Sequence, residues 1–152
     1  MKKNKLILEQ LEKRTDSIFS IRESAALPGG WIKAIRSGLG MSLQQLAKKL
    51  SVSRQSVQAL EAREKQGNIS LRSLREVAAA MDMELVYGFV PKAGSLDKYI
   101  ENKARQMAEQ IVARSSTTMQ LEDQEVSYER KQKAIAERTA LIKEELPKAL
   151  WD

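Results

Sequence analysis

The 152-residue chain contains no cysteine and no histidine. Without cysteine it can form neither disulfide bonds nor thiolate metal sites. Without histidine it lacks the side chain on which general acid–base catalysis and zinc binding most often depend. Aromatic residues make up only 5% of the sequence, and residues that favour helices dominate. These absences argue against an enzyme and predict a mainly α-helical protein without a metal or other cofactor.

Long apolar runs are also missing. No stretch approaches the roughly 18 apolar residues that a membrane-spanning helix needs. The chain begins with basic residues, but Glu9, Glu12 and Lys13 interrupt the next segment, so there is no signal-peptide core. We therefore expect a cytoplasmic protein.

The positive charge is concentrated in the middle of the chain. Of the net charge of +6, residues 1–27 contribute +2, residues 28–92 contribute +5 and residues 93–152 contribute −1. A basic segment of this kind suits a polyanion, because neutralising phosphates releases counterions. The alternative is that the charge only keeps the protein soluble.

Pro28-Gly29-Gly30 is the clearest boundary in the chain. It separates an N-terminal helical arm, residues 1–27, from a central domain, residues 28–92. The remaining residues, 93–152, form a C-terminal helical region for dimerisation or partner binding. In the arm, apolar residues near one face predict an amphipathic helix over residues 3–19.

Four short helices are predicted in the central domain, over residues 31–37, 42–50, 53–63 and 71–81. The N-caps of the last three are Ser42, Ser53 and Ser70. Gly38 ends the first helix, and Gln66-Gly67-Asn68 forms a loop after the third.

Residues 84–90 are rich in β-branched and aromatic side chains and predict a short β-strand that ends at Pro91. No other segment predicts a strand, and an unpaired strand leaves its backbone groups unsatisfied. Pairing with the same strand of a second copy is the simplest solution and indicates a homodimer. The alternative is pairing with an irregular N-terminal stretch.

Two further helices are predicted after the strand, over residues 95–114 and 121–146, with a break at Ser115–Thr118. In the second of them, apolar residues recur every seven positions, which indicates a packing partner. The seam consists of Leu121, Tyr128, Ile135 and Ile142. Trp151 can anchor in a partner's pocket or fold back on the last helix.

Residues 41–61 have the pattern of two short helices joined by a tight turn. Their apolar inner face consists of Leu46, Ala47 and Leu50 on the first helix, Val57 and Leu60 on the second, and Val52 as a plug in the turn. Polar residues project from the start of the second helix: Ser53, Arg54, Gln55, Ser56 and Gln58. Arg suits a guanine edge and Gln an adenine edge in the major groove. The alternative is a helical hairpin with no DNA role.

Residues 31–83 resemble the Cro/lambda-repressor-like, or XRE, helix-turn-helix family. The resemblance rests on Gln45-Leu46-Ala47, Val52-Ser53, Ser56-Val57 and Leu60-Glu61. It implies that Arg54 and Gln55 read bases, that Ser56 contacts phosphate, and that Arg36 and Glu61 form an ion pair. The sequence departs from the family at Leu43, where many relatives have a DNA-contacting Gln.

We expect Gln44 to replace that missing contact, and Gln58 to join the base-reading set. The candidate phosphate contacts are Ser42, Ser53, Ser56, Lys48, Lys49, Arg63 and Lys65, with Arg72 as a further basic residue. Each lysine or arginine taken singly can equally be a solvated surface charge, so the cluster carries the prediction.

Nearly the whole chain resembles the "mobile mystery protein A" family. The matching residues are Pro28, Gly30-Trp31-Ile32, Leu85-Val86-Tyr87, Val90-Pro91, Thr118-Met119, Leu121-Glu122-Asp123-Gln124 and Leu150-Trp151-Asp152. Members resemble regulators encoded beside a Fic-domain protein, as in a toxin–antitoxin pair. The resemblance implies an antitoxin-like protein whose flanking helices restrain a Fic-domain AMP-transferase.

Thr118 and Glu122 match most of the Ser/Thr-x-x-x-Glu-Gly/Asn motif of Fic inhibitors, but Asp123 departs from it. By this resemblance Glu122 would pair with a catalytic arginine of the partner. The alternative is an ordinary first-turn carboxylate that the helix dipole favours.

The sequence as a whole predicts a lambda-repressor-like helix-turn-helix domain flanked by helices, in a dimeric DNA-binding transcription regulator. The alternative is a pure interaction protein that inhibits a Fic-domain enzyme with little specific DNA binding. An enzyme is disfavoured because no Gly-rich nucleotide loop is present, and Glu144 and Glu145 are more simply solvated.

Overall fold

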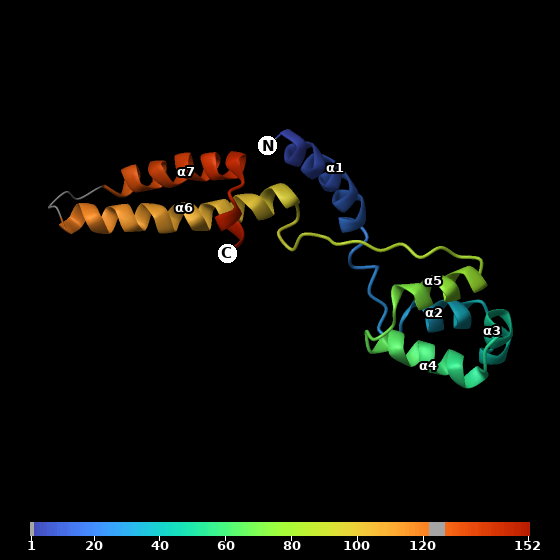
Figure 1. Ribbon diagram of the computed structural model, residues 1–152. Coiled ribbons are helices and arrows are strands. Elements are labelled where there is room, and N and C mark those ends of the chain that lie inside the picture. Colours follow the sequence, from blue (N-terminus) through green and yellow to red (C-terminus); the bar gives the residue numbers. More distant parts are fainter. Residues whose placement is uncertain (1, 122–126) are drawn as a thin grey trace. The chain divides into compact units, whose positions relative to one another are not determined.

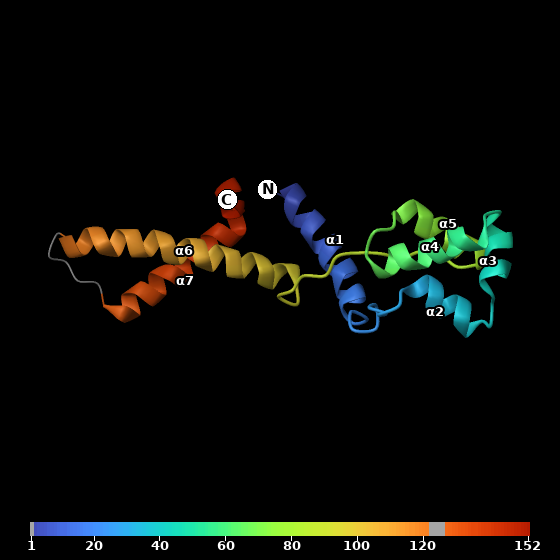
Figure 2. The same cartoon turned by 90° about the horizontal axis from the view of Figure 1, so that it is seen from below.

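The computed structural model describes residues 2–121 and 127–152, and over these residues the chain is mainly helical (Figures 1 and 2). It forms seven α-helices and one short 3-10 helix there. None of these helices is both long and apolar enough to cross a membrane. The chain divides into two compact units, Ile21–Gly88 and the combination of Met1–Ser20 with Phe89–Asp152.

The Ile21–Gly88 unit consists of four short helices around one apolar core (Figure 1). They are α2 (Trp31–Gly38), α3 (Leu43–Leu50), α4 (Arg54–Lys65) and α5 (Leu71–Ala80). All four were predicted from the sequence, and their ends agree within two residues. The buried core residues are Ile32, Leu46, Ala47, Val57, Val77 and Met81.

Serine side chains start three of these helices, as their sequence positions predicted. The Oγ atoms of Ser42, Ser53 and Ser70 each accept a hydrogen bond of 3.1 Å from the backbone N–H three residues later. At Ser42 the side chain of Gln45 returns a bond to the Ser42 N–H at 2.8 Å, which completes a capping box. Each cap satisfies a backbone donor that the helix leaves unpaired.

The strand predicted over residues 84–90 does not form within the single chain, because no strand is present in its described parts. A strand needs a partner to take its backbone hydrogen bonds, and no other described segment pairs with these residues. Val86 and Phe89 are 78% and 90% exposed. The Arg75 guanidinium of α5 lies over the Tyr87 ring, 5.7 Å from its centroid, and so connects the segment to that helix.

The second unit is an antiparallel helical hairpin with an additional helix. Helices α6 (Leu96–Leu121) and α7 (Tyr128–Glu145) lie side by side, and α1 (Lys2–Phe19) packs against α6 (Figures 1 and 2). The small buried residues Ala104 and Ala108 allow α7 to approach α6 closely, and Ile142 fills the space between them. The Glu12 carboxylate on α1 accepts a hydrogen bond from the backbone N–H of Leu96, at 2.9 Å, and so caps α6.

The helix break predicted at Ser115–Thr118 is wrong, because α6 continues to Leu121. The Ser115 and Thr117 hydroxyls donate to the carbonyls of Ile111 and Ala113, at 3.2 and 3.0 Å. Bonding back to the preceding turn accommodates these side chains inside a helix. The last helix, predicted from residue 121, instead begins at Tyr128, with Ser127 as its N-cap.

Two residues of the seven-residue seam, Ile135 and Ile142, pack in the α6–α7 core. Leu121 belongs to α6 and not to the last helix, and its side chain lies outside the described residues. Tyr128 is 75% exposed and does not take part. A 3-10 helix (Lys148–Trp151) follows α7 and buries Leu150. The Trp151 ring stacks on Tyr99 of α6, with 6.0 Å between the centroids, so the terminal aromatic folds back on α6.

Candidate nucleic-acid interface

Helices α3 and α4 and the turn between them form a rigid pair. Leu46 and Ala47 on α3 and Val57 on α4 are completely buried, and Ala47 is small enough for the two helices to touch. The prediction that Val52 plugs the turn is wrong, because Val52 is 42% exposed. Backbone geometry holds the turn instead: Ser51 adopts a left-handed conformation, and the Val52 N–H donates to the Ala47 carbonyl at 3.0 Å.

The start of α4 presents a group of exposed polar side chains. Arg54, Gln55 and Gln58 are all exposed on its first turn and a half. Ser53 caps the helix, and its hydroxyl lies 2.8 Å from the Ser56 hydroxyl. The structure therefore gathers the sequence-predicted base-reading residues of α4 with two predicted phosphate contacts. A helix N-terminus with free N–H groups also favours an anion.

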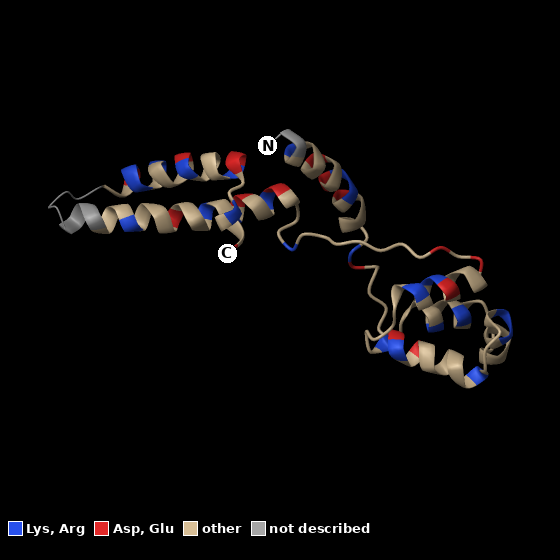
Figure 3. Ribbon diagram, viewed as in Figure 1, with Lys and Arg blue, Asp and Glu red and all other residues tan. Residues whose placement is uncertain are grey.

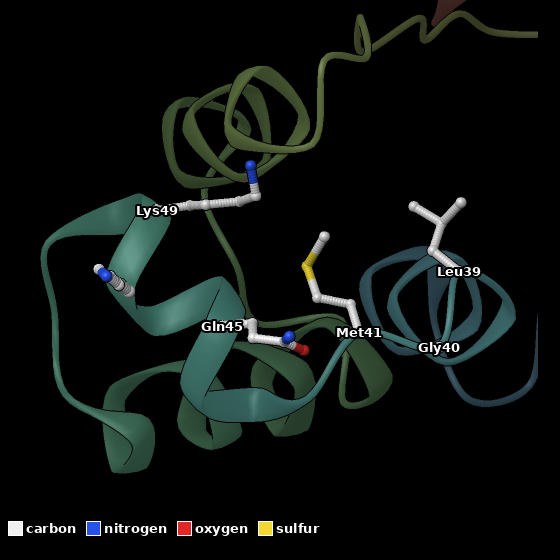
Figure 4. Close-up of a pocket in the computed structure, with 6 residues that line it drawn as sticks. Leu39, Gly40, Met41, Gln45 and Lys49 are labelled. Carbon is white, nitrogen blue, oxygen red and sulfur yellow. The ribbon is translucent and has the colours of Figure 1, made fainter.

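The predicted contacts on α3 divide between its two ends. Ser42 caps the helix, and Gln44 is exposed in the first turn. Lys48 and Lys49 lie in the last turn, close in sequence to the start of α4. Together with Leu39, Met41 and Gln45 they line a hollow of about 490 Å³, into which Met41 and Lys49 extend (Figure 4).

Arg63 and Lys65 lie in the last turn of α4, at the opposite end of the helix from Arg54. Figure 3 shows basic residues at both ends of this helix. A rise of 1.5 Å per residue places Arg63 about 14 Å further along the helix axis than Arg54. Arg63 and Lys65 can therefore contact only a phosphate on a different stretch of the DNA backbone from the stretch that faces the N-terminus of α4. Arg72 lies in the first turn of α5, and its guanidinium contacts Glu76 at 3.5 Å on the exposed surface.

A partly buried ion pair connects α2 to α4. The Arg36 side chain donates from Nη2 to Oε2 of Glu61, at 3.3 Å, and a second bond joins Nε to Oε1. Its Nη1 donates to the Met41 carbonyl at 2.8 Å, in the segment before α3. The two side chains are only 13% and 10% exposed. One guanidinium thus holds α2, the start of α3 and α4 in fixed relation.

Glu64 makes a second connection between α2 and α4 that sequence reasoning missed. Its two carboxylate oxygens accept hydrogen bonds from the backbone N–H groups of Trp31 and Ile32, at 2.7 and 2.9 Å. The carboxylate therefore caps α2 from a residue 33 positions later in the chain. The one signal in the sequence is that Gly30, before α2, offers no side chain to cap it.

These features define a helix-turn-helix domain with an exposed, polar and basic face at the start of its second helix. Residues 32–87 match the helix-turn-helix family model HTH_3, which describes a DNA-binding domain. The match covers less than half of the chain and includes none of α1, α6 and α7. No curated protein and no solved structure matches the chain.

Proposed function

We propose that the protein is a sequence-specific DNA-binding transcription regulator and not an enzyme. The observation that carries the proposal is the exposure of Arg54, Gln55 and Gln58 at one end of α4, on a buried α3–α4 core. Arg and Gln are the side chains that best discriminate guanine and adenine in the major groove. The Ile21–Gly88 unit has ten Lys and Arg against six Asp and Glu, a net charge of +4 that suits a phosphate backbone.

Replacing Arg54 and Gln55 together with alanine is expected to remove sequence preference. Each lost base contact costs about 1–3 kcal/mol at its base pair, so specific affinity should fall at least tenfold. The measurement is binding to DNA from the region upstream of the protein's own coding sequence, compared with scrambled DNA of equal length, across a salt series. Binding to the scrambled DNA should change little.

Arg72→Ala is the matched control, because it also removes a guanidinium from this unit but lies away from the start of α4. It should weaken binding to both DNA sequences by a similar small factor. If the double variant also weakened both sequences equally, Arg54 and Gln55 would be only phosphate contacts, and the proposal of sequence-specific reading would fail.

We further propose that the protein acts as a homodimer that pairs through residues 84–90. In support, these residues are not strand-paired within the described chain, and Val86 and Phe89 are largely exposed. Antiparallel pairing centred on Tyr87 would place Leu85 opposite Phe89 of the second copy, and Val86 opposite Gly88. Apolar cross-strand pairs of this kind stabilise sheets. A dimer would present two α4 helices to a palindromic site.

Val86→Asp combined with Phe89→Asp is expected to weaken the dimer at least tenfold, since it puts charge where apolar contacts would form. Sedimentation velocity over a concentration series measures the association. Tyr128→Asp is the control, because Tyr128 is a comparably exposed aromatic residue in α7. A wild-type chain that stays monomeric at every concentration, or equal effects of the two variants, would contradict pairing through this segment.

The resemblance to regulators encoded beside Fic-domain proteins leads us to propose an antitoxin-like role as well. Helix α1 exposes Leu6, Ile7 and Leu11, which a protein partner can cover. The alternative is a pure inhibitor of a Fic-domain AMP-transferase with little specific DNA binding, which predicts no salt-sensitive DNA affinity. Glu122, the residue predicted to reach the partner's active site, lies outside the described residues, as does the side chain of Thr118.

A further inference from the structure

A groove between α1, α6 and α7 combines an apolar floor with a charged rim. It encloses about 720 Å³. Ile100 of α6 is buried, and Leu8 of α1 and Leu146 after α7 are half-buried, so these three residues form the floor. All of the residues that line the groove belong to the unit outside the helix-turn-helix match.

The rim carries a net negative charge. Its charged residues are Lys5, Glu9 and Glu12 from α1, Asp97 from α6, and Lys143 and Glu144 from α7. Lys143 is already neutralised, because its Nζ lies 2.8 Å from Asp97 and 3.8 Å from Glu101. In total, the rim has four carboxylates and two ammonium groups, so its net charge is −2.

Two of these carboxylates are available to a ligand. Glu9 on α1 and Glu144 on α7 are exposed, and neither forms an ion pair with another side chain in the described parts of the chain. They come from different helices, α1 and α7, and both line the groove. An occupant that satisfies both the floor and the rim must have an apolar body and a positive charge.

The size of the groove distinguishes a small molecule from a protein. Small-molecule sites enclose about 300–1,000 Å³, and this groove of about 720 Å³ falls within that range. A stable protein interface needs about 20–30 residues on each side, whereas eleven residues line the groove. The dimensions therefore fit a compact ligand better than a second protein.

We propose that this groove binds a lipophilic organic cation. The apolar body of such a ligand covers Leu8, Ile100 and Leu146, and its positive charge lies between Glu9 and Glu144. This inference does not depend on DNA binding, and every residue that it uses lies outside residues 32–87. In a DNA-binding regulator, such a site would accept a small-molecule effector.

Tetraphenylphosphonium is a suitable probe, because it is a cation with a large apolar surface. Tetraphenylborate, an anion of the same shape, is the matched control compound. Titration of the full-length protein, followed by two-dimensional NMR, should give saturable binding of the cation with one site per chain. The backbone signals of Leu8, Ile100 and Leu146 should shift, while those of residues 32–87 stay in place. Tetraphenylborate should leave the signals of the groove unchanged.

Glu9→Gln combined with Glu144→Gln should weaken the binding of tetraphenylphosphonium about tenfold, as expected for two partly exposed charge contacts. Glu109→Gln combined with Glu137→Gln is the matched control, since both residues are exposed on α6 and α7 but do not line the groove. The control changes the net charge equally and should retain wild-type affinity. Equal binding of the two tetraphenyl ions, equal losses in the two double variants, or shifts outside the groove would overturn the proposal.

Discussion

Glu61→Ala is expected to lower the free energy of unfolding of the Ile21–Gly88 unit by about 3 kcal/mol. The substitution leaves the Arg36 guanidinium without its carboxylate in a position where the Arg36 side chain is only 13% exposed. An uncompensated charge in such a place is costly, because neither water nor another protein group replaces the lost partner. The loss therefore exceeds what a surface ion pair contributes.

Urea unfolding followed by tryptophan fluorescence measures this effect. The chain has two tryptophans, so a Trp151→Phe background leaves Trp31 as a reporter of the Ile21–Gly88 unit. Glu61→Gln should cost less than Glu61→Ala, because its amide oxygen can still accept a hydrogen bond from Arg36.

Glu76→Ala is the control for this series. It also breaks a Glu–Arg pair in the same unit, but the side chains of Arg72 and Glu76 are 90% and 63% exposed. Exposed pairs contribute at most about 1 kcal/mol, so this variant should be nearly neutral. Comparable losses in Glu61→Ala and Glu76→Ala would show that the buried pair does not hold α2 against α4.

The features of the fold that depend on near neighbours could be predicted from the sequence. Ser42, Ser53 and Ser70 each bond to a backbone group three residues away, so local pattern alone located the starts of α3, α4 and α5. The exposed face of α4 followed from the same periodicity. Local signals succeed here because both members of each interaction lie on one short segment.

Features that depend on distant neighbours could not be predicted in this way. Residues 84–90 have the composition of a strand, but a strand forms only where a partner takes its backbone hydrogen bonds. Glu64 caps α2 across 33 positions, and Glu12 caps α6 across 84. The groove is lined from three separate helices, so none of its segments shows the site alone.

The helix break that was predicted at Ser115–Thr118 is wrong for a different reason. A run of Ser and Thr weakens a helix when their hydroxyls compete with the backbone for hydrogen bonds. In α6 the hydroxyls of Ser115 and Thr117 bond instead to carbonyls of the preceding turn. The composition of that run permits both outcomes, so the sequence alone does not decide between a break and a continuous helix.

Gly30→Ala is expected to destabilise the Ile21–Gly88 unit by about 3 kcal/mol, for two reasons that add. Gly30 has φ 84° and ψ 159°, a backbone conformation that is almost exclusive to glycine. An added Cβ would also lie 2.8 Å from Oε2 of Glu64. The carboxylate must then move, and the N–H groups of Trp31 and Ile32 lose their acceptor.

Two other glycines in the same unit separate these causes. Gly40 has φ 66° but nothing within 4 Å of an added Cβ, so Gly40→Ala should show the backbone strain alone, about 1 kcal/mol. Gly38 has neither a positive φ nor a close neighbour, so Gly38→Ala should be neutral or slightly stabilising. Urea unfolding reported by Trp31 ranks the three variants, and equal losses at Gly30 and Gly40 would exclude a contribution from Glu64.

A double-mutant cycle tests the Glu64 cap directly. Glu64→Ala removes the acceptor of two backbone N–H groups and should itself cost about 1–2 kcal/mol. Once the carboxylate is absent, an alanine at position 30 meets no obstacle and displaces no cap, so only the backbone strain remains. The combined variant should therefore be more stable than the sum of the single losses predicts, by about 1–2 kcal/mol, the value of the cap that is counted twice in that sum. Strict additivity would mean that Gly30 is required only for its backbone conformation, and that α2 does not depend on the close approach of α4.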